Sequence, residues 1–339
     1  MKNLITEQKF NEILSAFENL KPLLVVGDVG IDKYTFGEVK RISPEAPVPV
    51  LEVTKEWLKL GLAANISHNL QTLQIPSTLC GVIGDDKNAD VFEDLLEDNH
   101  LKTWGLIRSS DRPTTFKERV TTNTQQICRI DYESSESIND TVAQKFIARI
   151  EELSKTHSAI ILEDYAKGAM TQKVIEDVIK FSNQNNILVA VDPGRTTPPL
   201  FYQGATLLKP NLVEAKAMVE FLGFKEKKVE KLAEILIDKL KIEKLVITLG
   251  PEGMALYDSK VHKSLQYIPT VANEVFDVSG AGDTAIALLT SSLVAGATLE
   301  EAAWISNCGA GVVVGKKGTA TVDQKELKDF YGNLKKRFI

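Results

Sequence analysis

The chain has 339 residues, 43% hydrophobic and 25% charged, which is enough to form one large globular domain. Its formal net charge of −6 argues against a nucleic-acid-binding protein. Three widely spaced cysteines and four scattered histidines give neither a disulfide framework nor a metal-binding spacing. No apolar run is long enough to span a bilayer or to act as a secretory signal, and we expect a cytoplasmic protein with no nucleic-acid or membrane partner.

The apolar pattern predicts alternating helices and strands. Apolar residues recur at helical spacing between residues 6 and 20, and a buried strand follows at residues 23–26. Similar apolar runs lie at residues 159–162, 187–191 and 245–249, and helical patterns between them include residues 172–181 and 229–240. Continuous apolar runs are typical of parallel strands covered on both faces. The sequence therefore predicts an α/β fold, a three-layer α/β/α sandwich with a mostly parallel central sheet.

Two stretches differ from this pattern. Residues 33–53 and 113–132 are rich in Thr, Val, Tyr and Phe and have turn signals but little helical period. They predict a small antiparallel sheet outside the main sandwich. Because no repeat, low-complexity tract or Pro/Gly-rich linker interrupts the chain, we expect residues 1–339 to form a single domain with a β lid.

Polar residues follow the predicted strands directly. They are Asp28, Asp164, Asp192, Asn211 and Gly250. Ligands of open parallel sheets bind at the carboxyl ends of the strands, so these positions mark the expected site.

Residues 277–284 read Asp-Val-Ser-Gly-Ala-Gly-Asp-Thr and precede an apolar run at residues 285–289. Small residues at a helix N-terminus leave backbone N–H groups available to bind an anion. A carboxylate at Asp283 would repel that anion, but it suits a general base that takes a proton from an incoming hydroxyl during phosphoryl transfer. The alternative is a glycine-rich loop with an aspartate cap.

This segment resembles the C-terminal signature of the ribokinase family of carbohydrate kinases, also called the PfkB family. Further motifs occur in the family's order: Gly27-Asp28, Arg-Ile-Ser-Pro-Glu-Ala-Pro-Val-Pro-Val at residues 41–50, Asp-Tyr-Ala-Lys-Gly at 164–168 and Gly-Lys-Lys-Gly-Thr-Ala at 315–320. The set is similar to one branch, the D-glycero-β-D-manno-heptose-7-phosphate kinases of ADP-heptose and lipopolysaccharide synthesis. The resemblance implies a ribokinase-like fold, ATP and Mg²⁺ as cofactors, phosphorylation at O1 and a homodimer formed through the β lid.

The resemblance also implies roles for residues around the nucleotide. Asp283 is the catalytic base, with Gly280, Ala281 and Gly282 as the anion hole. Cofactor-binding residues are Asn211, Glu214, Thr248, Gly250, Gly253, Asn307 and Gly311, and Glu214 holds Mg²⁺ through water. Two alternatives stay open. Asn-x-x-Glu is also a common helix cap, and the small residues near Gly311 also suit close helix packing.

On the sugar side, the resemblance implies that Asp28 and Asn65 bind substrate hydroxyls. The cations Lys117, Arg119, Arg129 and Lys167 suit a substrate that already carries a phosphate. Arg129 suits a solvated strand edge equally well. Asp32 suits a sugar-binding carboxylate and a solvated loop about equally.

Two positions depart from the family pattern. Leu62 stands where the family has a glycine, and Gly194-Arg195 stands where the branch has a lysine after Asp-Pro. They leave open a kinase for another sugar, sugar phosphate or nucleoside, or a non-catalytic sugar- or nucleotide-binding protein. Gly-x-Gly-x-x-Gly and P-loop spacings are missing, which disfavours a dehydrogenase and a P-loop NTPase. A His-x-Gly-His motif is also missing, so we expect the kinase without a fused nucleotidyltransferase.

Overall fold

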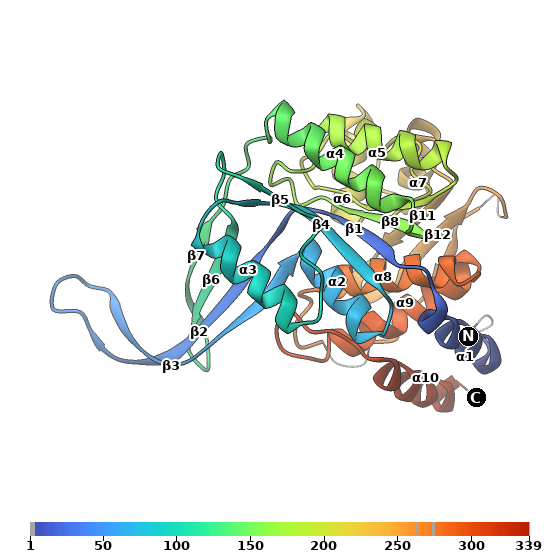
Figure 1. The fold of residues 1–339 in the computed structure, drawn as a ribbon. Coiled ribbons are helices and arrows are strands. Elements are labelled where there is room, and N and C mark those ends of the chain that lie inside the picture. Colours follow the sequence, from blue (N-terminus) through green and yellow to red (C-terminus); the bar gives the residue numbers. More distant parts are fainter. Residues whose placement is uncertain (1–3, 262–263, 273–274, 339) are drawn as a thin grey trace.

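The computed structural model describes residues 4–261, 264–272 and 275–338, with side chains described to residue 336. Its centre is a sheet that runs through the molecule between two layers of helices (Figure 1). The strand order in the described part of the chain is β13-β12-β11-β10-β9-β8-β1-β4-β5. The strands are β1 (Leu23–Gly27), β4 (Ser77–Gly84), β5 (Leu106–Ser109), β8 (Ala159–Glu163), β9 (Leu188–Asp192), β10 (Leu207–Leu208), β11 (Lys244–Thr248), β12 (Met254–Asp258) and β13 (Gln266–Ile268).

Neighbouring strands from β5 to β11 pair in parallel, and β12 and β13 add an antiparallel edge. Parallel strands need crossover helices, and these cover both faces of the sheet. Alternate residues of one strand enter different cores: Val25 belongs to one cluster, and Leu24 and Val26 belong to the other. The prediction of a three-layer α/β sandwich with a mostly parallel sheet is confirmed.

The two helical layers come from different parts of the chain (Figure 1). One layer holds α1 (Glu7–Ala16), α2 (Ala63–Thr72), α3 (Lys87–Asp98), α8 (Ala281–Val294), α9 (Leu299–Val313) and α10 (Gln324–Phe338). The other holds α4 (Asp140–Ser154), α5 (Gln172–Gln184), α6 (Leu212–Phe221) and α7 (Val229–Leu240). Short 3₁₀ turns lie at η1 (Phe17–Asn19), η2 (Pro199–Tyr202) and η3 (Gly250–Glu252). In the described residues, no helix combines the length and apolarity needed to cross a bilayer.

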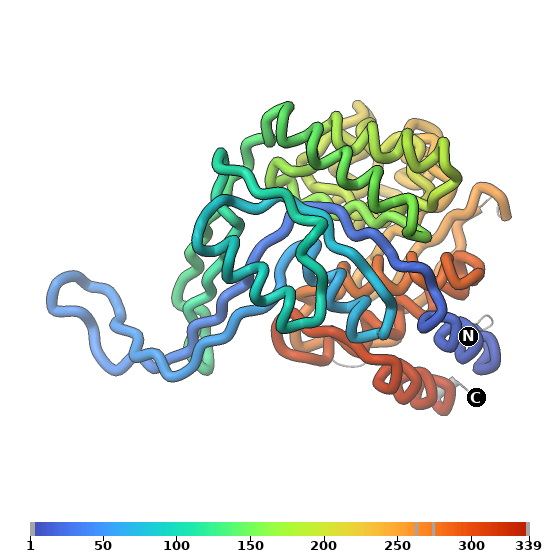
Figure 2. The backbone as a smooth tube through the Cα atoms, viewed as in Figure 1, coloured from blue at the N-terminus to red at the C-terminus, as the bar shows by residue number. Residues whose placement is uncertain are grey.

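A second sheet of four strands lies to one side of the sandwich, in the order β3-β2-β6-β7. Its strands are β2 (Val29–Ile42), β3 (Pro49–Leu62), β6 (Thr115–Thr121) and β7 (Gln126–Tyr132). The outer part of the β2–β3 hairpin, residues 36–53, reaches away from the body of the molecule (Figure 2). We call residues 36–53 the arm. The β2–β3 and β6–β7 pairings are antiparallel, as predicted, whereas β2 and β6 pair in parallel because the chain passes through the main sheet between them.

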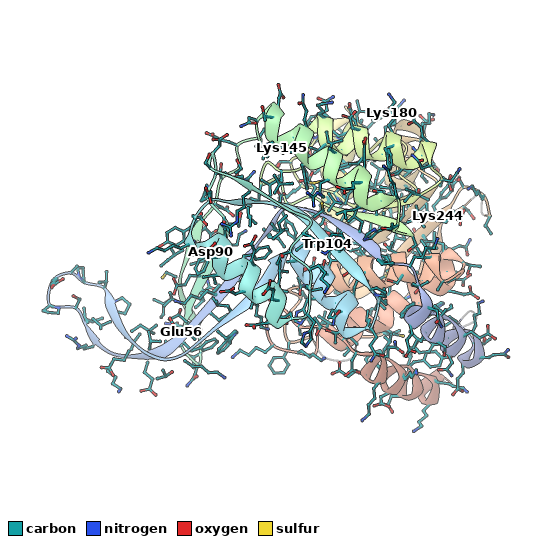
Figure 3. The ribbon with its side chains drawn as sticks, viewed as in Figure 1. Glu56, Asp90, Trp104, Lys145, Lys180 and Lys244 are labelled. Atoms are coloured by element: carbon teal, nitrogen blue, oxygen red, sulfur yellow. The ribbon has the colours of Figure 1, made fainter. Side chains whose placement is uncertain are left out.

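The cores are closed by large side chains that point inward from the helices. Phe146 of α4 is fully buried, whereas Lys145 beside it is exposed and points away from the sheet (Figure 3). This one-residue contrast follows from the helical period, which turns neighbouring side chains to different faces.

We expect Phe146→Ala to lower the free energy of unfolding by about 3–5 kcal/mol, because it removes buried apolar contacts and leaves a cavity. Equilibrium denaturation in urea measures the change. Lys145→Ala is the matched control and should stay within about 0.5 kcal/mol of the parent. Equal effects from the two variants would contradict the placement of this helix face.

Candidate active site

A cleft of about 1190 Å³ opens at the carboxyl ends of the central strands. Glu163 ends β8, Asp192 ends β9, Lys209 follows β10 and Thr248 ends β11, and all four line the cleft. The strand order runs outward from β1 in both directions, so the cleft lies beside the switch point of the sheet, where α/β folds bind ligands.

The cleft brings together most of the residues predicted from the motifs. The predicted residues that line it are Lys167, Arg195, Asn211, Glu214, Thr248, Gly250, Gly253, Gly280, Ala281, Gly282, Asp283, Asn307 and Gly311. The predicted sugar-side residues lie outside this lining: Asp28 lies between β1 and β2, Asn65 on α2, Lys117 and Arg119 on β6, and Arg129 on β7.

The N-terminus of α8 forms one wall of the cleft. Gly280 is its N-cap with a φ of 80°, a backbone conformation that glycine adopts without strain, and no side chain caps the helix. The Ala281 N–H turns back to the carbonyl oxygen of Val278 at 3.2 Å. At Gly282, a Cβ would lie 3.7 Å from the Lys209 Nζ. The absence of a side chain there keeps the helix terminus open toward a buried cation, which suits an anion.

Asp283 lies in the first turn of α8 and is 6% exposed. The Asn65 Nδ2 donates a hydrogen bond to its Oδ2 at 2.6 Å, and the Tyr165 hydroxyl donates one to its Oδ1 at 3.0 Å. Burial raises the pKa of Asp283 to about 6, and the negative charge of Asp192 acts in the same direction, whereas the two hydrogen bonds oppose the rise. A carboxylate with this pKa suits a general base near neutral pH.

A buried ion pair lies next to Asp283. The Lys209 Nζ is 2.6 Å from the Asp192 Oδ2, and Lys209 is 3% exposed. Burial lowers the pKa of Lys209, but the adjacent Asp192 carboxylate outweighs this effect and the pKa is raised, so the lysine stays charged. Glu163 is buried beside this pair, and its Oε2 has no hydrogen-bond partner among the described residues. Burial, together with the charges of Asp192 and Asp283, raises the pKa of Glu163 well above its ordinary value.

Asn211 and Glu214 form the helix cap that the sequence left open as an alternative. The Asn211 Oδ1 accepts hydrogen bonds from the N–H groups of Val213 and Glu214 at 2.9 Å, and the Glu214 Oε2 accepts one from the Asn211 N–H at 2.8 Å. This capping box begins α6. It uses one carboxylate oxygen of Glu214 while that residue still lines the cleft, so the cap leaves a role toward a metal open.

The far end of the cleft is built from tight backbone contacts. Gly253 has a φ of 93°, and a Cβ there would lie 2.0 Å from the carbonyl oxygen of Ile268. The Asn307 Nδ2 donates to the carbonyl oxygen of Pro269 at 2.8 Å. A Cβ at Gly311 would lie 2.8 Å from the ring of Phe330. These residues therefore serve close packing and also line the cleft.

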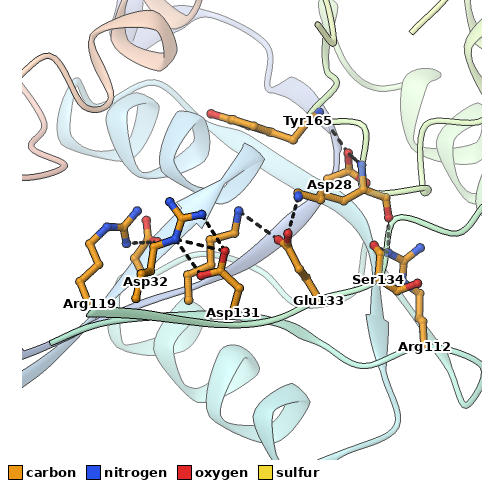
Figure 4. Close-up of polar contacts among 11 residues, drawn as sticks. Asp28, Asp32, Arg112, Arg119, Asp131, Glu133, Ser134 and Tyr165 are labelled. Atoms are coloured by element: carbon orange, nitrogen blue, oxygen red, sulfur yellow. Dashed lines mark hydrogen bonds and ion pairs between the residues drawn. The ribbon is translucent and has the colours of Figure 1, made fainter. Parts of the chain in front are cut away.

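Asp28 organises a loop on the sugar side. Its Oδ2 accepts the N–H groups of Tyr165 at 3.1 Å and Lys167 at 3.0 Å (Figure 4). Its Oδ1 accepts the N–H of Ala169 at 3.1 Å. Asp28 is 2% exposed, and burial raises its pKa while the three N–H groups lower it. The carboxylate thus fixes the backbone of residues 165–169.

Two lysines share one carboxylate next to this loop. The Lys117 Nζ lies 3.1 Å from the Glu133 Oε2, and the Lys167 Nζ donates to the Glu133 Oε1 (Figure 4). Burial raises the pKa of Glu133, but the two lysines outweigh it and the pKa is lowered. We call Lys117 and Lys167 the lysine pair; Glu133 is the carboxylate that bridges them. With two positive charges and one negative charge, this group keeps a net positive charge.

The predicted arginines have partners of their own. The Arg119 Nη1 donates to the Asp32 Oδ1 at 2.5 Å, and the Arg129 guanidinium binds Asp131, two residues away on the same strand (Figure 4). Arg129 is half exposed, at 51% of its side chain, as on a solvated strand edge.

The motifs gave no role to Tyr165, Lys209, Glu163 or Glu133. Tyr165 lies inside the Asp-Tyr-Ala-Lys-Gly motif, and Lys209 directly precedes Pro210-Asn211. Proximity to a motif is therefore the sequence signal that could have identified these two residues as part of the site. Their burial and partners come from elements far apart in the chain.

Comparison with known proteins identifies the family of this chain. Residues 24–326 match the model of the pfkB family carbohydrate kinases. The chain is 39% identical over 318 residues to the bifunctional protein HldE of Nitratiruptor sp. (94% of this chain, 66% of the relative). It is 38% identical over 307 residues to the protein of that name from Haemophilus influenzae (91% and 63%). The chain thus spans about two thirds of the length of these relatives.

Solved structures show the same fold. The Thermotoga maritima ribokinase is similar with a TM-score of 0.70 at 20% identity, covering 93% of this chain and 100% of the ribokinase. Phosphofructokinase-2 from Escherichia coli has a TM-score of 0.74 at 17% identity, covering 93% and 99%. The ribokinase-like fold predicted from the sequence is confirmed. Since the family model covers most of the sequence, the chain belongs to the pfkB family of carbohydrate kinases.

Proposed function

We propose that this carbohydrate kinase transfers the γ-phosphoryl group of ATP to O1 of D-glycero-β-D-manno-heptose 7-phosphate, with Asp283 as the general base. The observation that carries the proposal is the position of Asp283. Its carboxylate is buried at the open N-terminus of α8, lines the cleft and lies beside the buried cation Lys209. This arrangement suits removal of a proton next to developing negative charge.

In the proposed reaction, the acceptor oxygen forms a bond to the γ-phosphorus, and the bond from that phosphorus to the bridging oxygen of ADP breaks. The acceptor proton passes to Asp283. The amides at the N-terminus of α8 and the ammonium of Lys209 stabilise the charge on the transferred group.

We also propose Mg²⁺ as cofactor. Glu214 lines the cleft with one carboxylate oxygen outside its capping box, and oxygen ligands of this kind suit Mg²⁺, which keeps several waters. When bound, the metal would neutralise charge on the nucleotide phosphates. Thr248, Gly250, Gly253, Asn307 and Gly311 line the part of the cleft that we assign to ATP.

The lysine pair supports an acceptor that already carries a phosphate. Lys167 lines the cleft, Lys117 joins it through Glu133, and ammonium groups bind phosphate as point charges. The similarity to proteins named HldE, together with the motifs at residues 41–50 and 164–168, points to heptose 7-phosphate within this class. The second candidate is a kinase for another sugar phosphate, favoured by Leu62 and by Gly194-Arg195, of which Arg195 lines the cleft.

A coupled assay of ADP release tests the substrate. We expect Mg²⁺-dependent turnover with heptose 7-phosphate above that with hexoses, pentoses, their phosphates and nucleosides. Robust turnover of another sugar phosphate beside none with heptose 7-phosphate would select the second candidate.

Asp283→Asn should lower kcat by at least about 100-fold, because the amide cannot accept the acceptor proton. Turnover by the parent should fall as the pH drops below about 6, since the carboxylate is then protonated. Steady-state kinetics against pH measures both effects. Near-normal turnover by the variant would reject Asp283 as the base.

The same variant provides its own folding control. The pKa of Asp283 is raised from its ordinary value of 3.8 to about 6 in the folded chain, so ionisation across this interval disfavours the folded state. Asp283→Asn should therefore melt no lower than the parent at neutral pH and should gain on the order of 1–3 kcal/mol. A large loss of stability would instead indicate a structural role.

Lys117→Met should raise the KM for a phosphorylated acceptor by about 10-fold to 100-fold, the scale of one lost charge-assisted hydrogen bond. The KM for ATP should not change. Lys173→Met is the matched control, because Lys173 also pairs with a carboxylate, that of Asp177, but is exposed on α5. A uniform loss of kcat without a change in acceptor KM would contradict the phosphate-binding role.

We propose further that two copies pair through the β lid. The arm and its base expose Val39, Ile42, Val48 and Val53, which are between 38% and 60% exposed, and exposed apolar groups of this kind mark association surfaces.

Light scattering should therefore give twice the chain mass of 37.4 kDa for the parent. It should give the single mass for Val53→Glu, because the substitution places a charge on the apolar surface of the arm. Val261→Glu, which changes a still more exposed valine away from the arm, should leave the mass unchanged. A monomeric parent would overturn this proposal.

A further inference from the structure

The side chain of Tyr165 contacts the proposed base directly. Both carboxylate oxygens of Asp283 have donors: Oδ2 binds the Asn65 Nδ2 at 2.6 Å and Oδ1 binds the Tyr165 hydroxyl at 3.0 Å. The two donors differ in position. Asn65 is 2% exposed within α2, whereas Tyr165 is 36% exposed and lines the cleft. The Oδ1 side of Asp283 is therefore the side that an acceptor can reach.

The backbone of Tyr165 is held while its side chain reaches across the cleft. Its N–H donates to the Asp28 Oδ2 at 3.1 Å (Figure 4). The next residue, Ala166, has a positive φ of 54°, and its N–H donates to the Asp164 Oδ1 at 2.7 Å. Because these contacts fix the loop, rotation about the side-chain bonds of Tyr165 is the simplest way to free Asp283.

We propose that Tyr165 is a positioning residue that occupies the acceptor's place on Asp283 until the acceptor hydroxyl arrives. The inference rests on the proposed role of Asp283 as the base. An acceptor hydroxyl that donates to the Asp283 Oδ1 must replace the Tyr165 hydroxyl there or bind beside it. While the phenol donates to this oxygen it competes with water for it, so Tyr165 restrains the transfer of the γ-phosphoryl group to water.

The restrained side reaction is hydrolysis of ATP. In it, a water oxygen bonds to the γ-phosphorus, the bond to the bridging oxygen of ADP breaks, and the water proton passes to Asp283. The phenol cannot replace the base, because burial of its hydroxyl end, although the ring is partly exposed, and the nearby charge of Asp283 raise the pKa of Tyr165 well above its ordinary value, and it stays protonated. Tyr165 thus acts only as a donor to the carboxylate.

The hydrogen bond from the Tyr165 hydroxyl also affects the pKa of Asp283. The charged or titratable groups that face Asp283 are Tyr165, Asp192, Lys209 and Glu163. A hydrogen bond to the ionised form favours that form, so its loss raises the pKa of the carboxylate. Replacing the phenol of Tyr165 by a phenyl ring should therefore raise the pKa of Asp283, a change that a loss of packing alone does not produce.

The test is Tyr165→Phe beside Tyr267→Phe. Tyr267 also donates to a carboxylate, that of Glu230, but it lies on β13 outside the cleft. At pH 8, where Asp283 is ionised in every variant, Tyr165→Phe should release ADP without any acceptor at least about threefold faster than the parent, on the scale of one lost hydrogen bond. Tyr267→Phe should match the parent. An unchanged rate in Tyr165→Phe overturns the proposal.

Titration of the carboxyl carbons by ¹³C NMR separates this inference from the proposed function. In protein without nucleotide or sugar, the signal of Asp283, assigned by its loss in Asp283→Asn, should titrate at higher pH in Tyr165→Phe than in the parent. An unchanged titration overturns the Tyr165 contact even if the parent proves to be a kinase. If the parent turns over no sugar while the titration shifts, the proposed function fails and the contact stands.

Discussion

The site depends on one buried carboxylate that must keep its charge. Removing Asp283 from water disfavours ionisation, and the nearby charge of Asp192 adds to the cost. The opposing contributions come from the N-terminus of α8, the Asn65 amide, the Tyr165 phenol and the Lys209 ammonium. Because these groups belong to separate elements, the folded sandwich must bring them together to offset the burial of the carboxylate and keep its pKa at about 6.

The parallel sheet explains how these groups meet. Each strand from β8 to β11 ends at the same edge, so Glu163, Asp192, Lys209 and Thr248 come together although they are far apart in the chain. Lys209 is the cation that the buried carboxylates of this edge share. A cleft so rich in carboxylates favours ligands that bring positive charge with them, which agrees with a nucleotide that enters together with a divalent metal.

The sequence predicted the parts of this arrangement that are local. The strand-and-helix alternation and the glycine-rich start of α8 depend on short-range patterns, and both are present in the structure. β4 and β5 were not predicted, and neither was the antiparallel edge β12–β13, whose strands have no helix between them. The roles of Lys209 and Glu133 could not be predicted because a lysine or glutamate has no local signal of burial, and their partners lie on other strands.

Asp28 shows how one buried carboxylate can serve the loop that carries other site residues. The sequence assigned its carboxylate to a sugar, and the structure places three backbone N–H groups of residues 165–169 on it. That loop carries Tyr165 toward Asp283 and Lys167 toward Glu133. Residues 165–169 therefore contact both the proposed base and the lysine pair. In the proposed reaction, an acceptor with a hydroxyl at Asp283 and a phosphate at the lysines spans this loop, so Asp28 contributes to the site by holding the loop backbone.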